Sequence, residues 1–258
     1  MKYCIFCLDF FKSRPILVLV VSKFFILAYI LFLYRSSIVL GIYGPYASTG
    51  GFGAMGGLSA LTVQRFIGDV AGKFGPVFFL LSLLMGIESS VHFYGMVEKK
   101  YAVVNAMGGE TLQEHMVKAL SFDSAYELVF SILAGFTAGL PVLAFGLDLN
   151  WILYSVLVGL GLFASWLGVF ALIVGFARDR ATGITGYLIT SLLLYYATTA
   201  ARGSGNFYNF TLLAAQHTVP WYALYKIHLP GYPLLILLAL TAAGLASAAW
   251  GVSRFEVN

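Results

Sequence analysis

Apolar residues in this chain gather in long, nearly uninterrupted runs, separated by shorter polar or glycine-rich stretches. A helix needs about 20 residues to cross a bilayer core about 30 Å thick, and six of the runs are long enough. They cover residues 15–34, 74–97, 125–146, 150–177, 183–201 and 231–251. The ten-residue alternation of membrane β-barrels is absent from the sequence. The pattern therefore predicts an all-α, polytopic membrane bundle with six transmembrane helices.

Composition agrees with a single transmembrane domain that covers residues 1–258. Apolar residues make up 60% of the chain and charged residues only 10%, with a mean hydropathy of +0.88. An average soluble domain carries about 25% charged residues, so this composition excludes a water-soluble globule. The net charge of +4 needs no nucleic-acid partner to explain it, because basic loops on one side of a membrane suffice.

The positions of Lys and Arg predict the orientation, because cytoplasmic loops carry an excess of both. With the N-terminus inside, the cytoplasmic segments hold Lys2, Lys12, Arg14, Lys99, Lys100, Lys118, Arg178, Arg180 and Arg254. The outer segments hold only Arg35, Arg65, Lys73, Arg202 and Lys226. We therefore expect a multi-pass protein of the cell membrane with both termini in the cytoplasm. The first apolar run is too long for a signal peptide and is expected to be retained.

Three connections are longer than turns. The first outer loop, residues 35–73, is rich in glycine and becomes helix-like over residues 58–70. The second outer loop, residues 202–230, is expected to lie on or dip into the outer leaflet because it is aromatic. Its aromatic residues are Phe207, Tyr208, Phe210, Trp221, Tyr222 and Tyr225. The inner segment, residues 98–121, is polar and favours helix, which makes it the best candidate for contact with a soluble partner.

Glu88 is the most unusual residue in the apolar runs, because it places a carboxyl group within a predicted span. It precedes Glu98 by ten residues, which places it about 15 Å from the inner boundary and near the membrane midplane. A carboxyl group at this depth suggests a function. His92 follows on the same helix face and could share a proton with Glu88 or pair with it. Alternatively, Glu88 is neutral and hydrogen-bonded to Ser89, Ser90 or a polar group on another helix.

Other charged residues near the spans favour plainer interpretations. Lys23 lies eight residues into the first span, and its long stem is expected to carry the ammonium toward the cytoplasmic interface. Asp123 and Glu127 are expected in the headgroup zone, near the inner end of the third span.

Small residues recur at the four-residue spacing that lets two membrane helices approach closely. The pairs are Gly135 with Gly139, Gly161 with Ser165, and Gly244 with Ala248. They predict a compact bundle without pointing to a particular function.

Motifs for cofactors, metals and catalysis are weak or missing from the sequence. Cys4 and Cys7 have the Cys-x-x-Cys spacing but no second pair, and the four histidines do not form a metal motif. Around Lys73 the glycine-rich frame of a nucleotide-binding loop is missing. We therefore expect no cofactor, no metal and no enzyme activity, and any energy from ATP would have to come from another subunit.

Three short stretches mark the inner segment: Val-Glu-Lys-Lys at 97–100, Gly-Gly-Glu-Thr-Leu at 108–112 and Val-Lys-Ala-Leu at 117–120. With them the segment resembles the connection after the second span in the type 2 permeases of ABC transporters. Such permeases have six spans, and this cytoplasmic connection opens with an acidic residue and a basic cluster and closes with a lysine. The stretches at 9–15 and 250–256 are similar to the family's interfacial start and its short basic end.

The resemblance implies a permease subunit, with an exporter as the expected direction. It makes residues 98–120 the segment that docks on a cytoplasmic ATP-binding subunit. The residues implied in this coupling are Glu98, Lys99, Lys100, Gly108, Gly109, Glu110 and Lys118. A second permease copy, or a sister permease, would complete the substrate path. Two alternatives stay open: an accessory subunit of a larger membrane complex, and an ion-coupled carrier or enzyme centred on Glu88 and His92.

Overall fold

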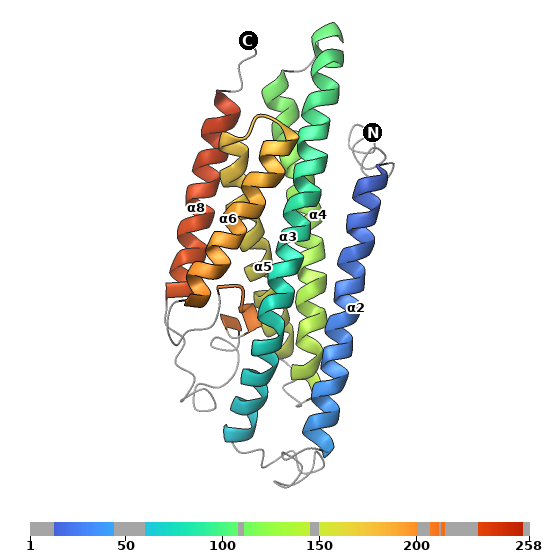
Figure 1. Ribbon diagram of the computed structural model, residues 1–258, viewed down its shortest axis with the longest axis vertical. Coiled ribbons are helices and arrows are strands. Elements are labelled where there is room, and N and C mark those ends of the chain that lie inside the picture. Colours follow the sequence, from blue (N-terminus) through green and yellow to red (C-terminus); the bar gives the residue numbers. More distant parts are fainter. Residues whose placement is uncertain are drawn as a thin grey trace.

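In the computed structural model the chain forms a bundle of long helices that run roughly along one axis (Figure 1). The structure describes residues 13–43, 60–107, 111–144, 150–200, 207–211, 213–214 and 232–254. The helices are α2 (Arg14–Tyr43), α3 (Ala60–Met107), α4 (Leu112–Ala144), α5 (Asn150–Phe176), α6 (Arg180–Ala200) and α8 (Tyr232–Ser253). The predicted all-α class is therefore confirmed for the described residues.

Five of the helices are long and apolar enough to cross a membrane. These stretches are Arg14–Phe32, Phe74–Glu98, Leu112–Leu140, Ile152–Phe176 and Leu234–Ser253. The run at 183–201 also forms a helix, α6, within the same bundle, but its threonines and tyrosines leave it less apolar than the other five. A multi-pass membrane protein is thus supported at the level of helix length and composition.

Helices α3 and α4 extend well beyond the predicted spans. Helix α3 has 48 residues and α4 has 33, because the polar residues that flank the apolar runs continue the helix. The helix-like character expected at 58–70 is confirmed, since α3 already begins at Ala60. The third predicted span began at residue 125, whereas α4 begins at Leu112. This earlier start decides the position of every charged residue on α4.

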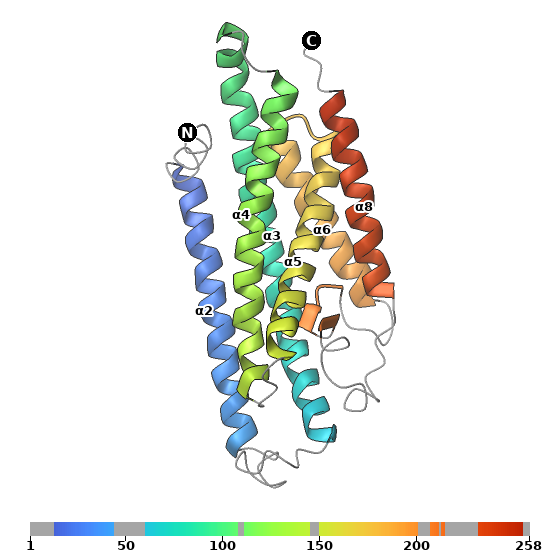
Figure 2. The ribbon, with the colours of Figure 1, turned by 180° about the vertical axis from the view of Figure 1, so that it is seen from behind.

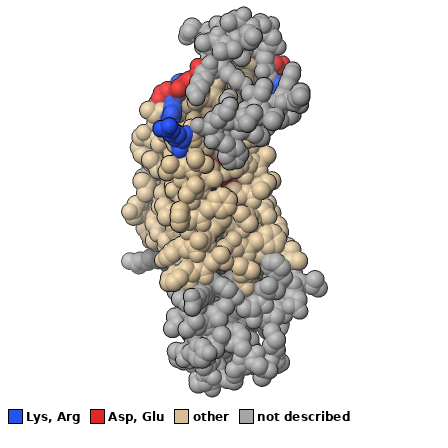
Figure 3. All heavy atoms as spheres, turned by 90° about the vertical axis from the view of Figure 1, so that its right-hand side faces the viewer, with Lys and Arg blue, Asp and Glu red and all other residues tan. Residues whose placement is uncertain are grey.

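Both described chain ends lie at one end of the bundle. The start of α2 and the end of α8 are there, together with the α3–α4 connection and the turn between α5 and α6 (Figures 1 and 2). On the face in Figure 3 the described charged side chains gather toward this end, and other residues form the middle. An apolar middle suits contact with lipid, while the side of the membrane on which this end lies stays a prediction.

Small residues bring α4 and α5 together, as their spacing predicted. A Cβ atom on Gly135 would collide with the backbone of Ser155 and Gly159, and one on Gly139 would collide with the Ser155 side chain. On α5, a Cβ added to Gly159 would meet the Ser131 carbonyl oxygen at 2.7 Å. The two helix backbones are therefore too close for any larger side chain at these positions.

The α5–α8 contact uses small residues in the same way. Gly244 on α8 faces the backbone of Gly168, and Gly251 faces the backbone of Gly175. The predicted pair of Gly161 and Ser165 acts differently, because a Cβ on Gly161 would meet the ring of Phe210, at 2.7 Å from its nearest atom, and not a neighbouring helix. Glycine at 161 thus makes room for an aromatic ring.

The described part of the second outer loop is buried in the bundle, where the sequence suggested contact with lipid. Phe207, Tyr208 and Phe210 are at most 1% exposed. The Phe210 ring packs against Phe78 of α3 with 5.9 Å between ring centroids, and the Tyr208 ring packs edge-on against Phe79 at 5.1 Å. Protein, not lipid, surrounds these rings. The loop's other aromatic residues, Trp221, Tyr222 and Tyr225, lie outside the described residues.

Candidate functional site at a buried ionic cluster

Lys23 lies at the centre of a group of charged side chains buried between α2, α3 and α4. Its Nζ atom is 2.7 Å from Oε2 of Glu88 on α3. It also donates hydrogen bonds of 3.0 Å to both carboxylate oxygens of Glu127 on α4. Lys23 is fully buried, so the expectation that its ammonium reaches the interface is wrong. Two carboxyl groups on neighbouring helices offer the ammonium partners that it would otherwise seek in water.

Two aromatic rings complete the surroundings of the lysine. Its Nζ lies 4.6 Å from the ring centroid of Tyr126 and 4.3 Å from that of Phe130, both on α4. These distances fall within the range of cation–π attraction, which strengthens when water is excluded. Tyr126 also faces Glu88. The ammonium is thus enclosed by carboxylates and aromatic faces.

A second pair of ionisable side chains lies one helical turn away. His92 on α3 and Asp123 on α4 are joined by a 2.5 Å contact between Nδ1 and Oδ1. His92 is 3% exposed and Asp123 is 1% exposed. Asp123 and Glu127, which the sequence placed in the headgroup zone, are thus buried between the helices of the bundle. Because α4 begins at Leu112, these residues lie about 16 Å and about 22 Å along the helix from its first residue.

The antiparallel arrangement of α3 and α4 explains why the pairs line up. Glu88 and His92 are four residues apart on α3, and Asp123 and Glu127 are four residues apart on α4, so each pair occupies one helix face. With the helices running in opposite directions, Glu88 lies at the level of Glu127, and His92 at the level of Asp123. Lys23 from α2 then joins the two glutamates.

The interpretations offered for Glu88 are resolved by these contacts. The hydroxyl groups of Ser89 and Ser90 are buried and have no hydrogen-bond partner among the described residues, so they do not support Glu88. Glu88 instead contacts Lys23 on another helix, and His92, which the sequence suggested as a partner of Glu88, contacts Asp123. The sequence analysis missed Asp123 and Glu127 as partners, although their four-residue spacing matches that of Glu88 and His92 and could have indicated a shared site.

The predicted coupling segment is only partly described. Glu98 is exposed, and α3 continues from it to Met107. Lys99 and Lys100 belong to α3, while Gly108, Gly109 and Glu110 lie outside the described residues. Lys118 is half-buried on the second turn of α4. The structure therefore brings Glu98 and Lys118 to the same end of the bundle but does not join them to the buried cluster.

The start of α4 is closed by a capping box. The backbone N–H of Glu114 donates to Oγ1 of Thr111 at 3.2 Å, and the backbone N–H of Thr111 donates to the Glu114 carboxylate at 3.3 Å. This reciprocal arrangement satisfies backbone donors that a helix leaves free at its first turn. The hairpin of α3 and α4 is thus well defined where α4 begins.

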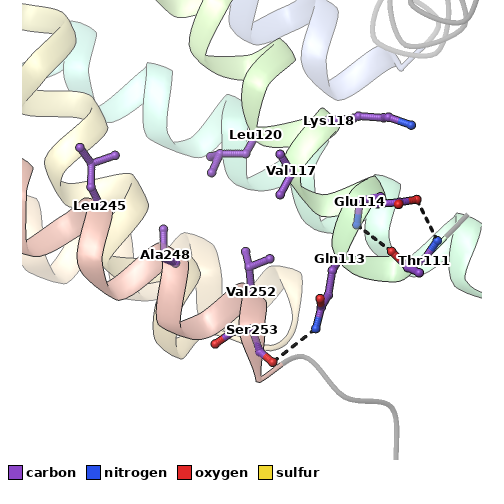
Figure 4. Close-up of a pocket in the computed structure, with 11 residues that line it drawn as sticks. Thr111, Gln113, Glu114, Val117, Lys118, Leu120, Leu245, Ala248, Val252 and Ser253 are labelled. Carbon is purple, nitrogen blue, oxygen red and sulfur yellow. Dashed lines mark hydrogen bonds between the residues drawn. The ribbon is translucent and has the colours of Figure 1, made fainter.

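A groove of about 730 Å³ separates the first turns of α4 from the last turns of α8 (Figure 4). Its walls are mainly apolar, with Val117 and Leu120 on one side and Leu245, Ala248 and Val252 on the other. Gln113 bridges the two helices by donating a 3.3 Å hydrogen bond to the Ser253 carbonyl. The groove lies at the end of the bundle that holds the α3–α4 connection.

Comparison with known proteins found no matching family model, curated protein or solved structure.

The chemistry available at the buried cluster is that of acids and bases. Within the described part of the chain, no group of three or more His, Cys, Asp or Glu side chains could hold a metal ion. An ammonium in contact with two carboxyl groups, next to an imidazole–carboxyl pair, can hold, share and exchange protons.

Proposed function

We propose that this chain is the permease subunit of an ATP-driven ABC transporter of the cell membrane, acting as an exporter. The observation that carries the proposal is the long α3–α4 hairpin. Helix α3 ends and α4 begins at the end of the bundle that also holds both described chain ends (Figure 1). In this proposal that end faces the cytoplasm, and a separate ATP-binding subunit docks there. A second permease copy, or a sister permease, encloses the substrate path.

The α3–α4 hairpin is suited to transmit a displacement from its connection into the bundle. Helices α3 and α4 run without interruption from the connection into the interior of the bundle, where their buried side chains form the ionic cluster. The capping box at Thr111 strengthens the end on which a partner would push. A displacement of the hairpin would therefore be carried along stiff helices to the contacts with α2 and α5.

The residues proposed to contact the ATP-binding subunit are those of the coupling segment. Exposed Glu98, together with Lys99 and Lys100, would form charge-assisted hydrogen bonds to it, and Gly108 and Gly109 would permit the tight connection. Glu110 and Lys118 would complete the contact. The apolar groove beside Lys118 offers an additional surface at the same end.

Reversing charges tests the proposal directly. We expect Glu98→Lys combined with Lys99→Glu to weaken co-purification of the ATP-binding subunit and to leave the folded bundle intact. The matched control is Asp69→Lys with Lys73→Glu, which reverses two charges near the other end of the same helix. Full recovery of the ATPase with the first variant, or equal loss with both, would contradict the proposed docking site.

The buried cluster favours a second candidate, an ion-coupled carrier. Ionisable groups inside a membrane bundle commonly mark ion or proton pathways. This candidate predicts transport that follows an ion gradient and needs no ATP. Transport by the purified chain in vesicles, with an imposed proton gradient and without nucleotide, would support it over the permease.

A further inference from the structure

The buried cluster contains one more acid than its cations can balance. Its acids are Glu88, Asp123 and Glu127, and its cations are Lys23 and, when protonated, His92. All five side chains are at most 3% exposed. The Tyr126 ring of α4 also borders the cluster, and a phenol cannot add a positive charge to it. With every acid ionised, at least one negative charge would remain buried without compensation, which proteins avoid by neutralising the group.

The geometry shows where the surplus lies. Asp123 is matched by His92 through the 2.5 Å contact. Its other oxygen, Oδ2, is buried and has no hydrogen-bond partner among the described residues, so a full negative charge on Asp123 needs the imidazolium close by. Lys23, by contrast, has a single positive charge for two glutamates. Its Nζ lies 2.7 Å from Oε2 of Glu88 and 3.0 Å from Oε1 of Glu127. The unbalanced charge therefore belongs to Glu88 and Glu127 together.

A proton is the ligand that fits this pair. A metal ion would need a shell of several oxygen ligands, and no such group exists among the described residues. A proton needs only one carboxylate oxygen, and two carboxyl groups that share one site characteristically retain a single proton between them. The Lys23 ammonium can bind the glutamate that is ionised at any moment while the other carries the proton.

We propose that the cluster is a proton-binding site, in which Glu88 and Glu127 hold one exchangeable proton between them around Lys23. The proton comes from water and converts one carboxylate to a carboxyl group. Its release leaves Glu88 of α3 and Glu127 of α4 both ionised, so the two carboxylates repel each other across the contact of α3 with α4. This inference is independent of the ABC permease: loss of the proton site would leave ATPase docking untouched.

Infrared spectroscopy of the full chain in lipid nanodiscs tests the proposal without any mutation. A protonated carboxyl group shows a C=O stretch that an ionised one lacks. At neutral pH we expect this band in the wild-type protein, and we expect it to shift when glutamate, but not aspartate, is labelled with ¹³C. The absence of the band, or a shift on aspartate labelling instead, would overturn the proposal. So would a band that appears only after Na⁺ is replaced by N-methylglucamine, because a metal ion would then occupy the site.

Three variants assign the proton to the pair. Glu88→Gln and Glu127→Gln each leave Lys23 balanced by one carboxylate, so each is expected to lose the band. Asp123→Asn is the matched control, since it removes an acid of the same cluster but leaves the two glutamates competing for Lys23, and it is expected to keep the band. Persistence of the band in both glutamine variants, or its loss in Asp123→Asn alone, would contradict the assignment.

Discussion

His92 of α3 and Asp123 of α4 contact each other inside the bundle, with 2.5 Å between Nδ1 and Oδ1. The contact joins the two helices of the proposed coupling hairpin. Both side chains are buried, with at most 3% of either exposed. The strength of this contact therefore affects both the stability of the bundle and the rigidity of the α3–α4 hairpin.

Removing one partner of this pair should destabilise the bundle strongly. We expect Asp123→Ala to lower the free energy of unfolding by about 3–5 kcal/mol, because it leaves the imidazole buried beside no carboxylate. The double variant with His92→Leu should cost less than the sum of the single changes. Denaturant unfolding in detergent measures both effects. Ser121→Ala, an exposed position on the same helix, is the control, and strictly additive losses would argue against a coupled pair.

The close α4–α5 contact predicts a sharp effect of side-chain size. Gly159→Leu should destabilise the bundle by about 1–3 kcal/mol or more, because its new atoms would overlap the Ser131 carbonyl and the Ile132 backbone. Gly95→Ala is the matched control, since nothing lies within 4 Å of a Cβ added there. At Gly95 we expect a gain of about 0.5–1 kcal/mol from reduced backbone freedom. Thermal unfolding in detergent compares the two, and equal effects would show that the helices are not in close contact.

The capping box makes a local prediction at the start of α4. Thr111→Ala removes the side-chain acceptor for the Glu114 N–H and should weaken the first turn by about 1 kcal/mol. Hydrogen exchange of the amides at residues 113–116 should rise several-fold, while the middle of α4 stays unchanged. Thr137→Ala removes a threonine in mid-helix and is the control. Unchanged exchange in the first turn would mean that the cap contributes nothing there.

Asp179 predicts a pH-dependent start of α6. Hydrogen bonds from the Thr182 hydroxyl and the Thr182 backbone N–H hold the pKa of this exposed carboxyl below its ordinary 3.8. A folded-state pKa that is lowered adds stability above the unfolded value, and that stability is lost as the pH falls through the folded value. The first turn of α6 should therefore exchange its amide protons faster, relative to the intrinsic rate, as the pH drops from about 6 to about 2.

The control for this prediction is Asp179→Ala, which removes the ionisable cap. The variant should show fast exchange at both ends of the pH range, with the wild type approaching it only in acid. A wild-type first turn that is equally protected at both pH values would contradict the role of the carboxylate.

Local patterns in the sequence predicted the helices well and their ends poorly. The apolar runs located five membrane-length helices, since hydrophobicity over 20 residues is a property of each segment alone. The early start of α4 was missed because residues 98–121, although expected to favour helix, were assigned to a connection separate from the third span. Packing of Met116 and Ala119 into the core, together with the Thr111 cap, makes residues 112–124 helical.

Small-residue pairs with the same spacing have different neighbours in the structure. Gly135 and Gly139 allow another helix to approach closely, as predicted, and that helix is α5, whereas Gly161 makes room for the Phe210 ring. Both have the same sequence spacing, so the spacing indicates only that something approaches closely. Which element approaches depends on how the bundle is assembled.

By itself, the sequence determined that this chain forms long apolar helices, that a carboxyl group lies deep within one of them, and that polar residues join the second and third. These are consequences of composition and periodicity along one segment. Only the tertiary structure decided that Lys23 stays inside with Glu88 and Glu127, because Lys23 and Glu127 are 104 residues apart and their meeting depends on the relative register of three packed helices. Each buried charge loses its contact with water wherever it lies in the chain. An oppositely charged partner that offsets this loss is brought close only when the bundle assembles.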